Sequence, residues 1–367
     1  MEYGSYYEHY LCAAEPDVTE RALAWDVAVG LQAVDGLEVS GYLRDVADKH
    51  IRGQIGIREV QERIEQYYAE RKDSVSAAEN EADKVAANIT EILDEPGFIF
   101  SAGGVVAIHH KLFHNVFPFA GKIREFNISK KEWVLDGDSV SYAFASEIRT
   151  ALDYDIDREK QFCYVGLGDE QTVGHISRFI SGLWQIHPFA EGNTRTTAVF
   201  CIKYLRYQGF KVDNRLFALR ARYFRDALVR ANYKNREKGI NADYSFLQKF
   251  FRNLLLGEKH VLKSRFAHVR AACCETEQEV EHSRPSIIAV DPYVGELLKA
   301  IGGALMSVRE MMEVLGLKGR DNFLKKYLNP AVAAGCIGML YPDNPRHPRQ
   351  KYRLTARGAL GRQDLHR

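Results

Sequence analysis

The sequence predicts a mainly α protein built from two or three domains. Apolar residues recur three or four positions apart through most of the chain, which is the period of an amphipathic helix. Strand-like stretches are confined to two places, 127–143 and 336–355. The length of 367 residues exceeds that of a single typical domain, which has roughly 100–200 residues.

The composition is that of an ordinary globular protein, with 46% hydrophobic and 27% charged residues. It excludes a disordered chain, a collagen-like fibre and a disulfide scaffold. No run of about 18 apolar residues is present and the first residues do not resemble a secretory signal, so we expect no membrane contact. The cysteines form no CxxC pair, which favours a reduced, cytoplasmic chain without structural zinc. They are Cys12, Cys163, Cys201, Cys273, Cys274 and Cys336.

Charge is distributed unevenly along the chain. Residues 1–70 carry 6 Lys and Arg against 14 Asp and Glu, a net charge of −8. Residues 286–367 carry 13 against 7, a net charge of +6. This asymmetry indicates three units with different partners, although chance variation on solvated surfaces is an equal alternative.

Three helices are predicted in an acidic N-terminal segment, residues 1–72. The first covers 18–35, and Gly36 follows it as a stop signal. The second begins after Ser40, and the third runs from 57 to about 71 with apolar residues on one face.

The next part of the chain is predicted to contain two helices and a hairpin. The helices cover 74–95 and 105–113. In 127–143, β-branched and aromatic residues flank Asp136-Gly137, a pair that tolerates the positive φ angles of a tight primed turn. This pattern predicts a β-hairpin.

A second group of helices follows the hairpin. The helix that ends at His187-Pro188 carries one apolar stripe, and it stops there because proline disfavours helical geometry in the residue before it. The predicted helices cover 140–157, 171–186, 193–208, 215–233 and 243–257.

The C-terminal part is predicted to be a separate small domain. Residues 271–286 have few large apolar side chains, so we assign a linker to 259–285. Residues 306–335 then give a helix–turn–helix pattern, and two short strands follow. This order of elements is typical of a winged helix, here assigned to 286–367.

The strongest local signal is the nonapeptide HPFAEGNTR at 187–195. Gly192, Asn193 and Thr194 lie at the start of a predicted helix, where free N–H groups and the helix dipole favour anions. Gly192 lets a phosphate approach the backbone closely, and Arg195 in the first turn can hold phosphate oxygens.

Two more residues of the nonapeptide suit transfer chemistry. Glu191 offers a hard oxygen ligand for Mg²⁺ that bridges phosphates. His187 has the pKa range of a general base, although a lone His-Pro between helices is more often a helix stop. Together the nine residues indicate a phosphoryl or nucleotidyl transfer site.

The nonapeptide resembles the HPFx(D/E)GNxR signature of Fic-domain proteins, most of which move AMP from ATP onto a hydroxyl side chain of another protein. KLFHNVFPFAGKIREFNI and ISRFISGLWQIHPF are also similar to family segments, and the hairpin resembles the family's flap. The similarity covers about 75–257. It implies a compact helical bundle with one β-hairpin flap over 73–258, ATP as substrate and Mg²⁺ as cofactor.

The resemblance implies a role for each residue of the motif. His187 deprotonates the target hydroxyl and Glu191 binds Mg²⁺. The backbone of Gly192 and Asn193 holds the phosphates, and Arg195 holds their charge. An alternative role for Asn193 is a simple helix N-cap.

The resemblance also implies contacts outside the motif. Tyr223 resembles the aromatic residue that contacts the nucleotide base, with an ordinary core aromatic as the alternative. The flap would hold the target backbone by strand addition. The flap residues assigned to this docking are Lys130, Lys131, Glu132 and Trp133, of which the lysines have solvated surface charges as their alternative.

Two positions depart from the commonest pattern, HPFxxGNGRxxR. Thr194 of the nucleotide-binding loop takes the place of the second glycine, and Ala198 takes the place of the second arginine. The missing guanidinium weakens the grip on the γ-phosphate. Transfer of another group, such as UMP or phosphate, is therefore an alternative to AMP transfer.

Many Fic relatives carry an inhibitory helix with the motif (S/T)xxxE(G/N). Glu79 and Asp35 are the nearest candidates here, and neither is preceded by the hydroxyl residue of the motif. Because Ala198 removes the arginine that such an acid pairs with, we expect both to be ordinary surface acids. Residues 1–72 still resemble the helical antitoxin segments of some members.

The C-terminal unit resembles winged helices appended to many Fic proteins. Its basic residues suit a phosphate backbone, so DNA binding through 307–353 is one expectation. A wing that docks a protein or packs in a homodimer is the alternative. A DNA-binding regulator with a nucleotide-sensing Fic domain therefore competes with the transferase. The basic residues are Arg320, Lys325, Lys326, Arg346, Arg349, Lys351 and Arg353.

Overall fold

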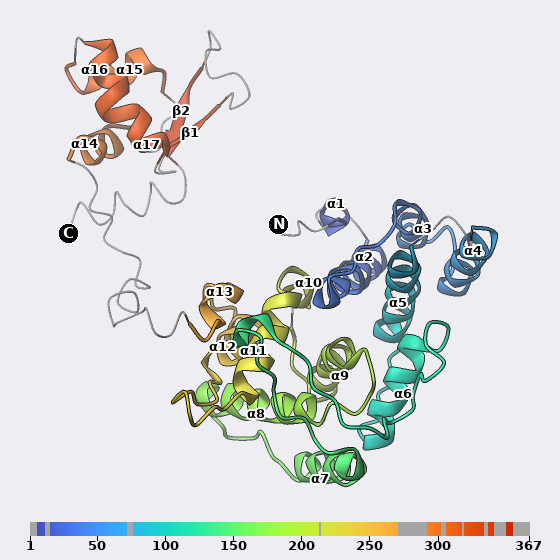
Figure 1. Ribbon diagram of the computed structural model, residues 1–367. Helices are drawn as coiled ribbons and strands as arrows, with labels where there is room; N and C mark the ends of the chain where they lie inside the picture. The colour runs from blue at the N-terminus through green and yellow to red at the C-terminus, as the bar shows by residue number, and fades with distance from the viewer. Residues whose placement is uncertain are drawn as a thin grey trace. The chain divides into compact units, whose positions relative to one another are not determined.

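In the computed structural model the chain forms two compact units, Met1–Cys274 and Glu275–Arg367 (Figure 1). The division falls within the stretch assigned to a linker. Cys163 and Cys201 are free thiols, and the other four cysteines lie outside the described residues. The structure describes residues 6–11, 15–71, 76–212, 214–270, 292–301, 306–317, 319–333, 337–340 and 350–354.

The predicted N-terminal helices are confirmed, and they share one hydrophobic core with the rest of the first unit. The first helix stops at Gly36, which takes a left-handed φ of 72°. The Ser40 hydroxyl caps the next helix by accepting the Leu43 N–H at 2.9 Å. The elements are α1 (Glu8–Leu11), α2 (Pro16–Gly30), η1 (Leu31–Asp35), α3 (Gly41–Ile51) and α4 (Ile57–Glu70).

The helix α9 (Asn193–Tyr207) is the centre of this unit (Figure 1). All of its residues from Asn193 to Leu205 are buried. It is enclosed by α5 (Ala77–Asp94), α6 (Ala102–Phe113), α8 (Asp169–Ile186) and η1. Because α9 begins inside the nonapeptide, its packing fixes where that loop lies.

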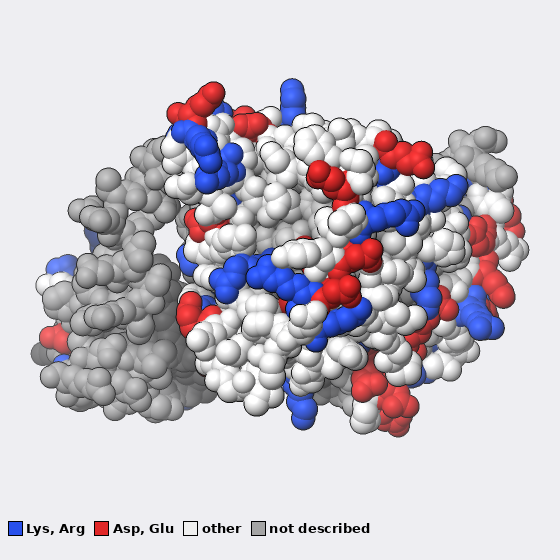
Figure 2. Space-filling view, turned by 90° about the horizontal axis from the view of Figure 1, so that it is seen from below, with Lys and Arg blue, Asp and Glu red and all other residues white. Residues whose placement is uncertain are grey.

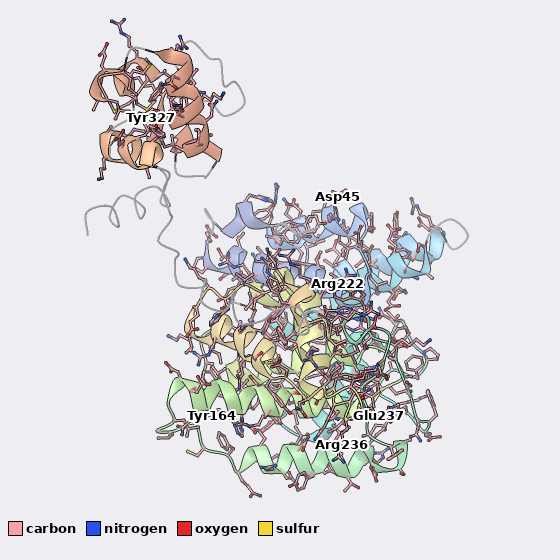
Figure 3. All side chains as sticks on the ribbon, turned by 60° about the vertical axis from the view of Figure 1, so that its left-hand side comes forward. Asp45, Tyr164, Arg222, Arg236, Glu237 and Tyr327 are labelled. Carbon is pink, nitrogen blue, oxygen red and sulfur yellow. The ribbon has the colours of Figure 1, made fainter. Side chains whose placement is uncertain are left out.

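The outer helices are joined to the centre by a buried carboxylate. Glu159 accepts the Tyr164 hydroxyl at 3.0 Å and the Tyr204 hydroxyl, and it lies 2.7 Å from Nε2 of His175. Figure 3 labels Tyr164 beside the green helices. With its partners in place, this carboxylate links α7 to α8 and α9. The outer elements are η3 (Ala145–Glu147), α7 (Ile148–Lys160), α10 (Arg215–Leu219), α11 (Ala221–Asn232), α12 (Ser245–Leu256) and α13 (Ser264–Ala267).

The prediction of a β-hairpin at 127–143 is right about the turn but wrong about the strands. The Asp136-Gly137 pair does take positive φ angles, 59° and 83°. The described residues on either side form no β-ladder, and the tip is a 3₁₀ turn, η2 (Trp133–Leu135). Val134 and Leu135 are fully buried, so the chain turns into the core instead of extending as a free hairpin.

The helix predicted over 140–157 begins later, at Ile148. Residues 140–144 have no regular secondary structure, and Val140 is buried in the core. In this stretch the Tyr142 ring packs against the His187 ring, with 4.1 Å between centroids. The segment 127–143 is called the flap below.

The second unit has helices followed by a two-stranded sheet, as the sequence predicts. Ser307 and Glu310 form a capping box at the start of α15. The strands pair antiparallel, and Met306 bridges to Tyr352. Arg346, Arg349 and the side chain of Arg353 lie outside the described residues. The elements are α14 (Pro292–Ile301), α15 (Val308–Val314), α16 (Arg320–Phe323), the π-helix η6 (Leu324–Leu328), α17 (Asn329–Ala333), β1 (Ile337–Met339) and β2 (Tyr352–Leu354).

The described surface mixes both signs of charge. On the face shown in Figure 2, Lys and Arg side chains are interspersed with Asp and Glu side chains. Among the described residues, no helix has both the length and the apolar character needed to cross a bilayer.

Candidate active site

His187 lies at the abrupt end of α8. Its backbone is left-handed, with φ 51° and ψ 59°, a conformation that few residues other than glycine adopt. Its N–H donates to the Trp184 carbonyl oxygen at 3.1 Å, and Pro188 prevents a further turn. The end of α8 at Ile186 confirms the predicted helix stop. Backbone positions of this kind persist only where the surroundings hold them, and they cluster at functional sites.

The imidazole of His187 is 3% exposed and has a defined tautomer. Nδ1 lies 3.2 Å from the Trp184 carbonyl oxygen, which can only accept, so Nδ1 carries the proton and Nε2 keeps its lone pair. Burial, followed by the charge of Lys130, lowers the pKa of His187 well below its usual range. The ring is therefore neutral at neutral pH, which is the form that a general base needs.

Two side chains hold the loop before α9 in shape. Asn193 donates its amide to the Phe189 carbonyl oxygen at 2.7 Å and accepts the Phe189 N–H at 3.0 Å. His109 stacks on the Phe189 ring at 3.7 Å between centroids, and its Nε2 lies 3.1 Å from the Glu191 carbonyl oxygen. Nδ1 of His109 accepts the Gly121 N–H at 2.8 Å, so Nε2 carries the proton.

Gly192 is required at the start of α9. Its φ is 76°, and a Cβ there would lie 2.3 Å from Cζ of Phe113. Gly192 is the N-cap, so the alternative role of Asn193 as N-cap is wrong. The Thr194 hydroxyl accepts the Trp184 Nε1–H at 3.0 Å, which ties the first turn of α9 to α8.

The Arg195 guanidinium is 2% exposed and surrounded by partners. Nε lies 2.8 Å from Oδ2 of Asp35, and Nη2 lies 2.6 Å from Oε1 of Glu81. Nη1 donates to Oε1 of Gln32 at 3.1 Å. The Phe113 ring faces the guanidinium at 4.9 Å. The proposed phosphate clamp is thus occupied by two carboxylates of this chain.

This arrangement corrects one expectation from the sequence. Asp35 does have an arginine partner, which is Arg195 and not the residue at position 198. Glu79 forms no ion pair with the described residues, whereas Glu81, two residues later on α5, does.

Glu191 carries the carboxylate assigned to a metal. Its side chain is 53% exposed, and Oε2 lies 3.0 Å from the ammonium of Lys130 in the flap. The described residues contain no group of three or more His, Cys, Asp and Glu side chains that could hold a metal alone. One accessible carboxylate beside the start of α9 fits Mg²⁺, which takes one or two carboxylates together with phosphate oxygens and water.

The other assigned residues lie in different places. Glu132 is buried, and both of its oxygens lie 2.9 Å from Nη2 of Arg225; burial raises the pKa of Glu132. Lys131 and Trp133 are exposed. Tyr223 is a buried core residue whose hydroxyl donates to the Phe246 carbonyl oxygen at 3.0 Å. Of the four residues assigned to target docking, Lys130 is the one that forms an ion pair with the nonapeptide, through Glu191.

His109 predicts a pH dependence of stability. Burial lowers its pKa from 6.5 to about 4. Because the pKa of His109 is lower in the folded than in the unfolded state, the neutral ring stabilises the fold fully above pH 6.5. This contribution is lost as the pH falls toward 4, which lowers the free energy of unfolding by about 3 kcal/mol. Urea unfolding at several pH values measures it. His109→Gln should flatten this part of the curve, and an unchanged curve contradicts the assignment.

Comparison with known protein families identifies the domain that contains this loop. Residues 99–205 match the model of the Fic/DOC family. These residues form a Fic domain. Residues 292–355 match the C-terminal domain of the filamentation induced by cAMP protein Fic-like family. The Fic match includes α6, the flap and the nonapeptide.

Relatives of the Fic domain include a curated protein named probable protein adenylyltransferase y4lH, from Sinorhizobium fredii. It is 29% identical over 129 residues, which are 34% of this chain and 62% of that relative, so less than two thirds of its length is matched. A Fic family protein from Desulfovibrio desulfuricans G20 is 19% identical, with 95% of this chain and 93% of that one covered and a TM-score of 0.40. BepC from Bartonella tribocorum with bound AMPPNP is 20% identical, with 48% and 85% covered and a TM-score of 0.39.

Three residues of the Fic site were not identified from the sequence. One sequence signal could have identified His109. It lies four positions after Val105 on an apolar helix face, where a buried polar side chain needs a hydrogen-bond partner. Gln32 and Glu81 had none, because they meet Arg195 across 163 and 114 residues of sequence.

Proposed function

We propose that this Fic-domain protein transfers AMP from ATP to a hydroxyl side chain of a target protein or of itself. The observation that carries the proposal is the buried, neutral His187, whose Nε2 is left with its lone pair by the Nδ1 contact to Trp184. The family match and the name of the curated relative support the same reaction.

In this proposal each group of the loop has one task. Nε2 of His187 takes the proton of the target hydroxyl, whose oxygen bonds to the α-phosphorus while the bond to the β-phosphate oxygen breaks and pyrophosphate leaves. The N–H groups at Gly192 and Asn193 and the guanidinium of Arg195 hold the phosphate charge. The Asn193–Phe189 bonds and His109 keep the loop in the shape that this requires.

Mg²⁺ is the cofactor that these residues fit. Glu191 would hold it together with nucleotide oxygens, and the ion would neutralise charge on the phosphates. The Lys130 ammonium forms an ion pair with the Glu191 carboxylate, so it must move away before Glu191 can hold the ion.

A conservative variant tests the metal role. Glu191→Gln should lower turnover at limiting Mg²⁺ by about ten-fold or more. It should hardly change the melting temperature, because an exposed ion pair contributes about 0–1 kcal/mol. Lys130→Gln breaks the same ion pair but keeps the carboxylate, so it should retain Mg²⁺-dependent turnover. Full activity of Glu191→Gln at limiting Mg²⁺, or unfolding by a chelator, would contradict the role.

We also propose that Asp35 and Glu81 inhibit the Fic site when no nucleotide is bound, because they hold Arg195. Nucleotide phosphates can reach Arg195 only when Asp35 and Glu81 release it. Both acids come from helices outside the nonapeptide, so movement of η1 or of the first turns of α5 would free the clamp.

Two alternatives have an observation in their favour. Ala198 is fully buried and supplies no second guanidinium, which favours a different transferred group such as UMP or phosphate. Incubation with a panel of nucleoside triphosphates, read by intact mass, distinguishes these groups.

The second alternative is a DNA-binding regulator with a winged helix. It is favoured by the exposed side chains of Arg320, Lys325 and Lys326 in the second unit. A mobility-shift assay of the full chain on random DNA at low and high salt tests it, because phosphate contacts give steep salt dependence.

A further inference from the structure

A cavity of about 870 Å³ lies in the first unit, away from the nonapeptide. Its walls are α2, the end of α5, the last turns of α9 and the chain that leads into α10. Its volume is within the range of small-molecule sites, about 300–1,000 Å³. The lining includes Leu23, Val27, Phe98, Lys203, Tyr207 and Asn214.

Lys203 is a buried cation in this wall without a carboxylate partner. It is 5% exposed, and its ammonium donates to the carbonyl oxygens of Ile92, at 3.0 Å, and Glu95. Among the described residues no ion pair involves Lys203. The Glu95 carboxylate is held instead by Lys111, at 2.6 Å and 2.7 Å. The two carbonyls at the end of α5 take two of the three ammonium protons, and buried charges are normally paired.

The same cavity holds an unpaired acceptor and an apolar wall. Oδ1 of Asn214 is buried and has no hydrogen-bond partner among the residues that the structure describes. A buried acceptor without a donor is costly, and a ligand N–H or O–H would satisfy it. Leu23, Val27 and the rings of Phe98 and Tyr207 supply apolar surface.

We propose that this cavity is a binding site for a small amphipathic organic anion. Its acidic group meets the third proton of Lys203, a hydroxyl or amino group donates to Asn214, and its apolar or aromatic body lies between α2 and the rings of Phe98 and Tyr207. Charges of both signs line the rest of the cavity, with Glu20 and Asp94 on one side and Arg206, Lys211 and Arg215 on the other walls. A single acidic group matches the one ammonium proton of Lys203 that the two carbonyl oxygens leave.

The site is distinct from the Fic loop. Asn193 opens α9 in the loop, and Lys203 follows ten residues later, about 15 Å along the helix at a rise of about 1.5 Å per residue. The proposal therefore does not depend on the proposed transfer reaction, and variants of the catalytic loop serve as controls.

Calorimetric titration of the full chain with a hydroxynaphthoate tests the site. One molecule should bind per chain. The methyl ester of the probe, which lacks the charge, and naphthoate, which lacks the hydroxyl, should each bind about ten-fold more weakly. Lys203→Met should remove the preference for the acid over the ester, and Asn214→Ala should remove the preference for the hydroxyl. His187→Asn and the exposed Lys160→Met should bind as the wild type does.

Because Lys203 also caps α5, a second variant leaves it in place. Ala24→Trp fills the cavity from α2, and it should abolish binding while thermal melting shows a folded protein. Equal affinity for acid and ester, no measurable binding by the wild type, or wild-type affinity in both Lys203→Met and Ala24→Trp would overturn the proposal.

Discussion

Replacing His187 with asparagine is expected to lower AMP transfer by about 10²–10⁴-fold, the usual effect of losing a general base. In the proposed reaction, the Nε2 lone pair of His187 accepts the proton of the target hydroxyl. Asparagine has no basic nitrogen, yet it tolerates the left-handed backbone at this position better than most residues do. The measurement is the rate of incorporation of labelled AMP into protein.

The matched variant His187→Ala separates chemistry from folding. It should be equally inactive but less stable than His187→Asn, because alanine is strained at a φ of 51°. Thermal melting of both variants should show cooperative unfolding. Transfer at the wild-type rate by either folded variant would remove His187 from the mechanism.

Asp35→Asn combined with Glu81→Gln is expected to raise transfer by about ten-fold at low ATP. These changes keep the size of each side chain but remove the negative charges of Asp35 and Glu81 beside Arg195. The guanidinium then becomes available to phosphate. One charge-assisted contact contributes about 1.5–3 kcal/mol, and ten-fold corresponds to about 1.4 kcal/mol. Steady-state kinetics should show the effect mainly as a lower KM for ATP.

The same double variant makes a prediction about stability. Without nucleotide it should melt below the wild type, because Arg195 stays buried with its charge unpaired. With ATP analogues its melting temperature should rise more than that of the wild type. Glu79→Gln is the matched control, because it lies on α5 near Glu81 but makes no ion pair with the described residues. Equal activity of the double variant and the wild type would show that the carboxylates do not restrain the site.

Features set by neighbouring residues were predictable from the sequence. The spacing of apolar residues located the helices of the first unit, because each helix is built from contacts three and four positions apart. The stop at Gly36 and the end of α8 before His187-Pro188 follow from local backbone preferences, and both are confirmed. The nonapeptide could also indicate a candidate site, because its residues are neighbours in the sequence and lie in one loop.

Features set by distant residues were not predictable in this way. The flap has the alternation of a hairpin, but burial of Val134 and Leu135 in the core overrides it. Asp35 is exposed, as expected, but its ion pair with Arg195 was missed because an arginine partner was sought only at position 198. Glu132 was assigned to target docking, whereas the structure pairs it with Arg225, 93 residues away.

The most direct test of the transferase is to follow the two ends of ATP separately. The wild type and His187→Asn are incubated with Mg²⁺, a bacterial lysate as the source of targets, and ATP labelled either on the α-phosphate or on the γ-phosphate. The proposed reaction predicts that the α-label enters protein with the wild type only, and that the γ-label leaves in pyrophosphate. Incorporation of the γ-label into protein, or equal incorporation of the α-label by wild type and variant, would contradict AMP transfer by this site.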